Sequence, residues 1–191
     1  MNWYKKYIEA GKVQEEPNKY SWVRLDCDAD IKDIHKGYTE TINEKDLYIL
    51  EQKGNNWSYG TEDKPHITTK WGINFDDPKK VIEVLEGEEG GEVMLDKIEV
   101  FDNDDNYDVL VILCESEALQ RLHKKLTDDL EIEDTYPEYK PHITIAYFKK
   151  GRAKQYVKSA TKAFTDLLLA FSFDELIFEN RKNEETKIKL D

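Results

Sequence analysis

Two stretches of the sequence decide the fold: "DKPHITTKWGI", residues 63–73, and "YKPHITIAYF", residues 139–148. Both contain the pentapeptide Lys-Pro-His-Ile-Thr, and their histidines, His66 and His142, lie 142 − 66 = 76 positions apart. In each stretch the histidine opens a run rich in β-branched residues, which is typical of a strand. The repeat therefore predicts two equivalent strands that contribute to one common site.

A β-strand directs residues i and i+2 to the same face. His66 is therefore expected beside Thr68, and His142 beside Thr144. The apolar residues of the two runs are expected on the opposite face: Ile67, Trp71, Ile73, Ile143, Ile145 and Tyr147. One face of these strands is thus polar and the other is part of a core.

Two imidazoles and two hydroxyls on one face suit the cleavage of a phosphodiester without a metal. A neutral imidazole takes a proton from the attacking hydroxyl, and an imidazolium gives one to the leaving oxygen. Threonine hydroxyls donate hydrogen bonds to the phosphate oxygens where charge grows in the transition state. The expected catalytic residues are His66, Thr68, His142 and Thr144. Lys70 shares the histidine face in an ideal strand, where it either binds the substrate phosphate or reaches solvent.

The composition describes one soluble domain with an acidic surface. The 191 residues include 28 Lys and Arg against 41 Asp and Glu, and the net charge of −13 repels a long phosphate backbone. Duplex DNA is therefore not expected as a partner, whereas a small anionic ligand is. No stretch has the apolar length of a membrane span or signal peptide, and Cys27 and Cys114 lack metal-ligand spacing. We expect a cytoplasmic protein with buried cysteines and no membrane partner, metal or cofactor.

The order of the expected elements is that of an α+β fold. Each half of the chain carries one His-strand between helices, which suggests an internal duplication. Besides the His-strands, the patterns predict a short helix within 1–19, a strand at 21–28, a helical segment within 29–53, a helix at 76–87, a hairpin over 93–115, a helix at 116–130, a helix at 153–168 and a hairpin over 171–191.

Paired His-x-Thr strands in a small α+β protein resemble the 2H phosphoesterase superfamily, which includes RNA-ligase-T-like and 2′,3′-cyclic phosphodiesterase proteins. The resemblance rests on His66-Ile67-Thr68 and His142-Ile143-Thr144 and runs from residue 21 to the C-terminus. It implies a bilobal, pseudo-twofold fold in which two antiparallel sheets line a central cleft, with helices outside. It also implies a metal-independent phosphodiesterase. We accordingly expect one domain over 21–191 and an N-terminal extension over 1–20.

The frame "EDKPHITTKWGI" after "WSYG", and the strand "SWVRLDCD", are similar to phage-encoded members of this superfamily. Some of those degrade the cyclic di- and trinucleotide messengers of the bacterial CBASS antiphage defence. The resemblance implies an enzyme that cleaves 3′-5′ bonds of small cyclic oligonucleotides in the host cytoplasm. Two alternatives stay open: an enzyme acting on 2′,3′-cyclic phosphate or 2′-5′-linked RNA ends, and a sponge that binds cyclic nucleotides without cleaving them. Intact His66 and His142 argue against the sponge, because binding alone requires no acid and base.

Other aromatic and histidine residues carry weaker signals. Trp57 and Tyr59 precede the first His-strand and are expected to bind substrate by stacking on a nucleobase. Tyr139, before the second His-strand, has the same potential, although such rings equally anchor loops. His35 and His123 have no threonine two positions on, and we expect solvated or helix-face side chains. The chain has no phosphate-binding glycine motif, which disfavours an ATP-using ligase.

Overall fold

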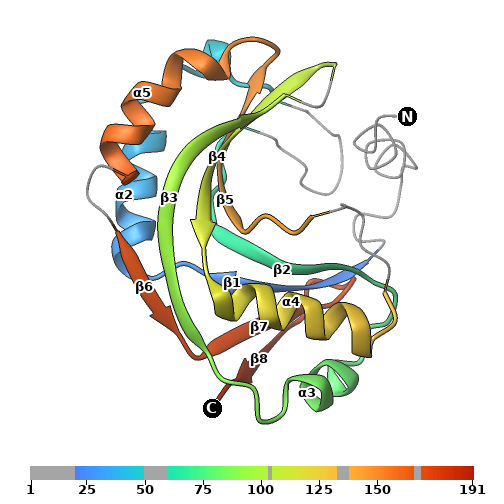
Figure 1. The fold of residues 1–191 in the computed structure, drawn as a ribbon. Coiled ribbons are helices and arrows are strands. Elements are labelled where there is room, and N and C mark those ends of the chain that lie inside the picture. Colours follow the sequence, from blue (N-terminus) through green and yellow to red (C-terminus); the bar gives the residue numbers. More distant parts are fainter. Residues whose placement is uncertain (1–19, 50–59, 103–104, 133–137, 166–168) are drawn as a thin grey trace.

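The strands form one curled antiparallel sheet with helices on its outer side (Figure 1). The structure is a computed structural model and describes residues 20–49, 60–102, 105–132, 138–165 and 169–191. Within these residues eight strands pair in the order β6-β3-β4-β5-β2-β1-β7-β8. Their bounds are β1 Ser21–Asp26, β2 His66–Ile73, β3 Gly91–Phe101, β4 Tyr107–Glu115, β5 His142–Lys149, β6 Ala170–Phe173, β7 Glu175–Glu179 and β8 Glu185–Lys189.

The sheet consists of two four-stranded halves that meet between β2 and β5. One half has the order β6-β3-β4-β5, and the other has the order β2-β1-β7-β8. Across the meeting line the described strands share a single residue pair, Ile67 opposite Ile143, the central residues of the two His-Ile-Thr motifs. The predicted pseudo-twofold α+β fold is confirmed, with the refinement that the two sheets are continuous through this pair.

The described helices cover the outer side of the sheet (Figure 1). They are α2 Ala29–Thr39, η1 Glu44–Asp46, α3 Lys79–Leu85, α4 Glu117–Asp129, η2 Ala153–Tyr156, α5 Val157–Ala160 and the π-helical η3 Thr161–Thr165. Side-chain caps begin the two longest: Asp28 accepts a hydrogen bond from the Ile31 amide at 2.9 Å, and Ser116 accepts one from the Leu119 amide at 3.3 Å. No helix in the described part of the chain is long and apolar enough to cross a membrane.

Each of the two longest helices packs behind the His-strand of the other half. Helix α2 precedes β2 in the chain but contacts β5, and α4 precedes β5 but contacts β2. Leu119, Leu122 and Leu126 form the apolar stripe of α4 and are fully buried. The halves are therefore interlocked by helix packing as well as joined by the strand pair.

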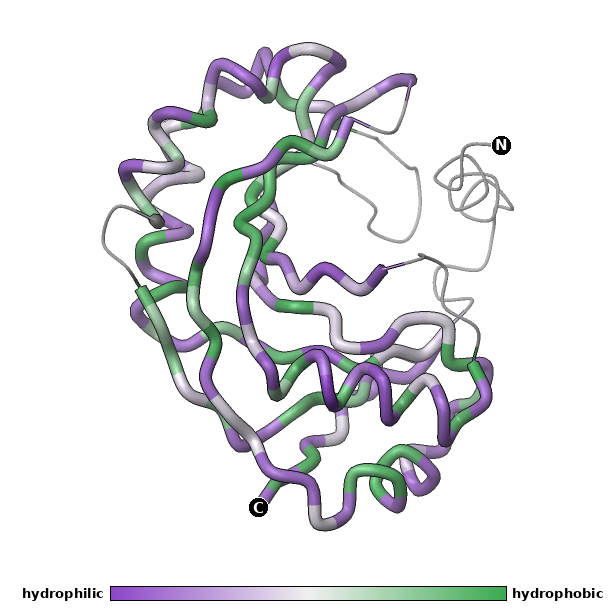
Figure 2. The backbone as a smooth tube through the Cα atoms, viewed as in Figure 1, coloured by the Kyte–Doolittle hydropathy of each residue, from purple (hydrophilic) through white to green (hydrophobic). Residues whose placement is uncertain are grey.

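The main hydrophobic core lies between the sheet and these helices. Figure 2 shows how apolar residues dominate β4, in which almost every residue is buried. Ile67, Ile143 and Phe148 are each 0% exposed. Cys27 and Cys114 are buried free thiols, as predicted. Burial at this junction therefore holds both His-strands in place.

Two predicted helical segments are less regular than expected. Within the described residues 29–49 of the predicted segment 29–53, the chain is helical in α2 and η1, after which Leu47 pairs with β5 as an isolated bridge. The predicted helix at 153–168 is helical over its described residues, 153–165, but changes type along η2, α5 and the π-helical η3. Here the Thr161 hydroxyl donates to the Val157 carbonyl at 2.9 Å, and β-branched residues weaken a regular α-helix. The predicted helix within 1–19 lies outside the described residues.

Replacing Ile143 by Ala should lower the free energy of unfolding by about 2–5 kcal/mol, because it leaves a cavity where the two halves meet. The measurement is urea denaturation of the full chain. Ile49, which is 53% exposed, supplies the matched control: Ile49→Ala should change stability by less than about 0.5 kcal/mol. Equal effects of the two substitutions would contradict the role given to the Ile67–Ile143 junction.

Candidate active site

Both motif histidines are the first residue of a strand, β2 in one motif and β5 in the other. The proline before each is buried and is anchored in the same way. The Cys27 amide donates to the Pro65 carbonyl at 3.2 Å, and the Cys114 amide donates to the Pro141 carbonyl at 2.9 Å. The repeated pentapeptide therefore has the same backbone support at both positions.

The ring of each motif histidine is oriented by its own backbone. Nδ1 of His66 lies 2.7 Å from the Lys64 carbonyl oxygen, and Nδ1 of His142 lies 2.7 Å from the Lys140 carbonyl oxygen. Because a carbonyl only accepts hydrogen bonds, Nδ1 carries the proton in the neutral ring. Nε2 then has the lone pair, so it can take a proton from a substrate or, once charged, give one up.

An aromatic ring packs edge-to-face against each motif histidine. The Trp22 ring lies 4.9 Å from the His66 ring at 66°, and the Phe101 ring lies 5.1 Å from the His142 ring at 74°. Such contacts limit the rotation of the imidazoles. Neither aromatic residue was predicted from the sequence, because each contact depends on which strands become neighbours.

The four motif side chains emerge on one face of the sheet. Ile67 and Ile143 lie opposite each other and are both fully buried. Opposed residues of antiparallel strands point the same way, and adjacent residues point the opposite way. The flanking motif residues are accordingly half-buried on the other side from the core. We name this side the motif face; it carries His66, Thr68, His142 and Thr144.

The motif face is apolar on the side of His142. Leu113 and Val111 of β4 pair with His142 and Thr144. Both belong to a second, smaller hydrophobic cluster that also includes Phe101. A substrate group lying here would contact hydrocarbon and aromatic surface.

The motif face is charged on the side of His66. Asp26 of β1 lies opposite His66, and Arg24, only 3% exposed, is its neighbour on the same face. The Arg24 guanidinium donates to Asp26 at 2.8 Å, to Glu185 at 2.7 Å and to Glu179. Three carboxylates thus surround this cation, which makes it a part of the scaffold and not a phosphate ligand.

Partial burial lowers the pKa of His142 below its ordinary value. The hydrogen bond to the Lys140 carbonyl opposes this shift, and positive charge on His66 adds to it. The neutral form of His142 is therefore favoured near neutral pH, and the two imidazoles are close enough to influence each other.

A β-bulge follows the motif in β2. The register with β1 shifts beyond Thr68, and the consecutive residues Thr69 and Lys70 are both buried. Nζ of Lys70 donates to Thr127 Oγ1 at 2.8 Å and to the Ile132 carbonyl at 3.1 Å, on the side of α4. The prediction that Lys70 shares the histidine face, as a phosphate ligand or a solvent-exposed cation, is wrong because the bulge reverses the alternation.

The same irregularity occurs in β5, where Ile145 and Ala146 are both buried and the register with β4 shifts. Beyond the two bulges, Trp71 and Tyr147 return to the motif face. The Trp71 ring lies 6.0 Å from Trp22, and Tyr147 belongs to the smaller hydrophobic cluster. Their predicted position in the core is therefore wrong for the same reason.

The other two histidines lie behind the sheet. Both lie on a helix, His35 on α2 and His123 on α4, which is the helix-face alternative of the prediction; His35 is 2% exposed, so its solvated alternative is excluded. The Tyr139 ring stacks on the His123 ring at 3.9 Å and anchors its loop, the second of the two roles considered for it. Trp57 and Tyr59, predicted to bind substrate, lie outside the described residues.

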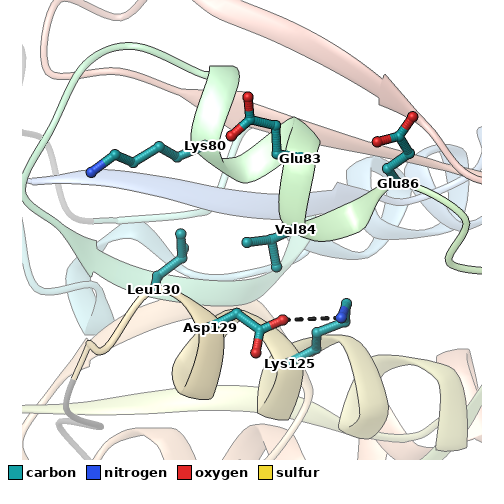
Figure 3. A pocket seen from close by; sticks show the side chains of 7 residues that line it. All are labelled: Lys80, Glu83, Val84, Glu86, Lys125, Asp129 and Leu130. Atoms are coloured by element: carbon teal, nitrogen blue, oxygen red, sulfur yellow. Dashed lines mark hydrogen bonds and ion pairs between the residues drawn. The ribbon is translucent and has the colours of Figure 1, made fainter.

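A groove of about 440 Å³ lies away from the motif face, between α3 and α4 (Figure 3). Its walls carry charges of both signs, and Lys125 is paired with Asp129 at 3.0 Å. The lining residues are Lys80, Glu83, Val84, Glu86, Lys125, Asp129 and Leu130. No motif residue contributes to it, so it is no part of the candidate site.

The donor set of the motif face suits proton transfer. It offers two imidazoles and two hydroxyls, each histidine already bound through Nδ1. Within the described ranges, no group of three or more His, Cys, Asp or Glu side chains could share a metal ion. A reaction without a metal stays a prediction.

Comparison with known proteins identifies the class. The fold and the paired His-x-Thr motifs define a 2H phosphoesterase, an enzyme that cleaves phosphodiesters. A family model described as the 2′-5′ RNA ligase superfamily matches residues 51–185, more than half of the chain, and the chain belongs to this superfamily. No curated protein sequence matches it.

Solved structures with a similar fold span nearly the whole chain. Escherichia coli LigT complexed with NADP+ is 14% identical with a TM-score of 0.54, covering 91% of this chain and 96% of its own. Kluyveromyces marxianus Usb1 with uridine monophosphate is 13% identical with a TM-score of 0.51, covering 91% and 99%. TT0787 of Thermus thermophilus is 12% identical with a TM-score of 0.53, covering 90% and 95%. At these identities the likeness shows the fold.

Stability should fall in mild acid because burial lowers the pKa of both His35 and His142. The unfolded chain, with histidine pKa values of about 6.5, binds more protons than the native one as the pH drops. The stabilisation is therefore complete above about pH 7 and is lost progressively as the pH falls from about 6.5 towards the lowered pKa values of the native histidines. Urea denaturation between pH 7.5 and 5.5 should show a smaller loss for the double variant His35→Gln, His142→Asn. An unchanged loss would refute this linkage.

Proposed function

We propose that the motif face is the active site of a metal-independent phosphodiesterase that cleaves 3′-5′ bonds of small cyclic di- and trinucleotides. The observation that carries this proposal is the pair of equivalent histidines, both oriented through Nδ1 and both beside a threonine on one face. We assign the general base to His142, whose neutral form is favoured by its lowered pKa. His66 is then the general acid.

The proton transfers balance in a single displacement. Nε2 of His142 takes the proton of a ribose 2′-hydroxyl while its oxygen forms a bond to phosphorus. His66, as the imidazolium, protonates the 5′-oxygen as its bond to phosphorus breaks. Thr68 and Thr144 donate hydrogen bonds to the non-bridging oxygens, where negative charge increases. The product is a linear oligonucleotide with a 5′-hydroxyl and a 2′,3′-cyclic phosphate; water in place of the 2′-hydroxyl would give direct hydrolysis.

Aromatic side chains near both histidines favour a substrate with a nucleoside on each side of the phosphate. Trp22 and Trp71 lie on the side of His66, and Phe101 contacts His142. Stacking on such rings is worth about 1–3 kcal/mol per base and tolerates different bases. The net charge of −13 supports a short substrate over a long polyanion.

The biological setting that we infer is counter-defence. A phage-encoded enzyme of this kind would remove the cyclic messengers of CBASS in the host cytoplasm before they activate their effectors. The residues around the first motif are similar to those of phage-encoded members of the superfamily, which supports this setting.

RNA-end processing is a second candidate function. It is supported by the description of the family and by two similar structures, Usb1 with uridine monophosphate and LigT complexed with 3′-AMP. The same acid and base would open a 2′,3′-cyclic phosphate with water as the nucleophile.

Replacing either motif histidine by Asn should lower kcat by about 10²- to 10⁴-fold. Asn can keep the hydrogen bond to the Lys64 or Lys140 carbonyl but offers no Nε2 for proton transfer. Thr41→Val is the control, because the Thr41 hydroxyl bonds the Tyr38 carbonyl at 2.7 Å, away from the motif face. Products formed from 3′,3′-cyclic GMP-AMP in EDTA, separated by chromatography, give the rates, and the wild-type pH profile should be bell-shaped.

A second substrate, an RNA ending in a 2′,3′-cyclic phosphate, separates the candidate functions. Cleavage of the cyclic dinucleotide alone would support the proposal. Cleavage of the RNA end alone would instead support a function in RNA-end processing. Binding of the dinucleotide without turnover would identify a sponge. Wild-type rates in both Asn variants would contradict the acid and base roles.

A further inference from the structure

The backbone carbonyls of both motif threonines accept hydrogen bonds from side chains of the opposite half of the chain. Tyr139, which precedes β5, donates its hydroxyl to the Thr68 carbonyl in β2 at 3.0 Å. His35, which lies in α2 before β2, contacts the Thr144 carbonyl in β5 through Nε2 at 3.1 Å. The two acceptors are equivalent residues of the repeated motif, whereas one donor lies in a loop and the other in a helix.

These carbonyls lie where the pairing of β2 with β5 ends. Within the two described strands, Ile67 and Ile143 form the single facing pair. Just beyond it, β5 pairs instead with residues 61 and 62, through the bridge of Thr61 with Ala146 and a bond from the Glu62 amide to the Ile145 carbonyl at 3.0 Å. A buried carbonyl without a donor costs about 1–3 kcal/mol, so side chains fill this gap in the ladder.

The donor state of both side chains follows from chemistry. A carbonyl only accepts, so His35 must carry a proton on Nε2 and Tyr139 must keep its phenolic proton. Burial lowers the pKa of His35 and raises the pKa of Tyr139. His35 is therefore neutral with Nε2 protonated, and Tyr139 remains a donor across the working pH range.

Both donors have rigid support behind the sheet. The Tyr139 ring stacks on His123 with an interplanar angle of 3°, and Nδ1 of His123 lies 2.7 Å from the Thr69 carbonyl in the bulge of β2. The His35 ring lies 6.3 Å from Phe164, which is fully buried. A change in either donor would consequently be transmitted to the motif strand and not absorbed by a mobile side chain.

We propose that His35 and Tyr139 are positioning residues that fix the separation of the two His-x-Thr motifs across the pseudo-twofold axis. Each holds the backbone of a threonine whose hydroxyl faces the phosphate, and each does so from the other half of the fold. This inference rests on the proposed function of the motif face. Its consequence is that losing one hydroxyl group behind the sheet impairs chemistry more than substrate binding.

Tyr139→Phe removes the hydroxyl and keeps the ring stacked on His123. We expect kcat to fall about 10- to 100-fold, since a displacement of about 1 Å at a reacting group has this effect, with a smaller change in KM. Tyr38→Phe is the matched control, because the Tyr38 hydroxyl donates to the Tyr156 carbonyl at the same 3.0 Å but away from the motifs. Equal kcat values for the two variants would overturn the inference.

His35 offers a rescue test on the other strand. Gln can place an amide donor where Nε2 of His35 lies, whereas Leu fills the space and donates nothing. His35→Gln should keep most of the wild-type kcat, and His35→Leu should lose about 10- to 100-fold. Equal activity of the Gln and Leu variants at equal stability would show that His35 is merely a packing residue.

A measurement that needs no catalysis, the pKa of His142, tests this inference independently of the proposed function. If the wild-type protein cleaves neither substrate, the proposed function fails, and the spacing of the motifs is still measurable from the pKa of His142 by NMR. Because charge on His66 contributes to that pKa, a shift in Tyr139→Phe, absent in Tyr38→Phe, would support the positioning role. The same His142 pKa in both variants would overturn it.

Discussion

The fold and the candidate site both depend on the pairing of Ile67 with Ile143, where the two halves of the sheet meet. Antiparallel partners point the same way, so burying these two side chains sends the histidine and threonine on either side of each to the opposite face. The register is strongly specified, because a slip by one residue would bury two imidazoles and expose two isoleucines. One apolar contact thereby turns a repeated pentapeptide into a single site.

A junction of one residue pair leaves backbone groups that neighbouring strands do not bond. The protein meets this need with bulges just after both motifs and with side chains from the helix layer and its loops. All four histidines of the chain serve the same two strands. Two lie on the motif face, and two behind it contact the carbonyls of Thr144 and Thr69. The same hydrogen bonds thus stabilise the fold and position the catalytic side chains.

Local regularities made much of this structure predictable. The i, i+2 alternation placed His66, Thr68 and the buried isoleucines correctly, since it holds wherever a strand is regular. It failed for Lys70 and Trp71, because a bulge depends on the partner strand and not on local sequence. The contacts of Trp22, Phe101 and His35 were likewise hidden, since they join residues far apart in the chain. Their positions follow from strand order, which the sequence pattern left open.

In the proposed mechanism the two motifs act on one phosphate. The most direct measurement is an NMR titration of the histidine ring resonances with inorganic phosphate. We expect the resonances of His66 and His142 to shift together with one dissociation constant, while those of His35 and His123, both on the far side of the sheet, change little. Independent shifts of the two motif histidines, or a response from one alone, would contradict it.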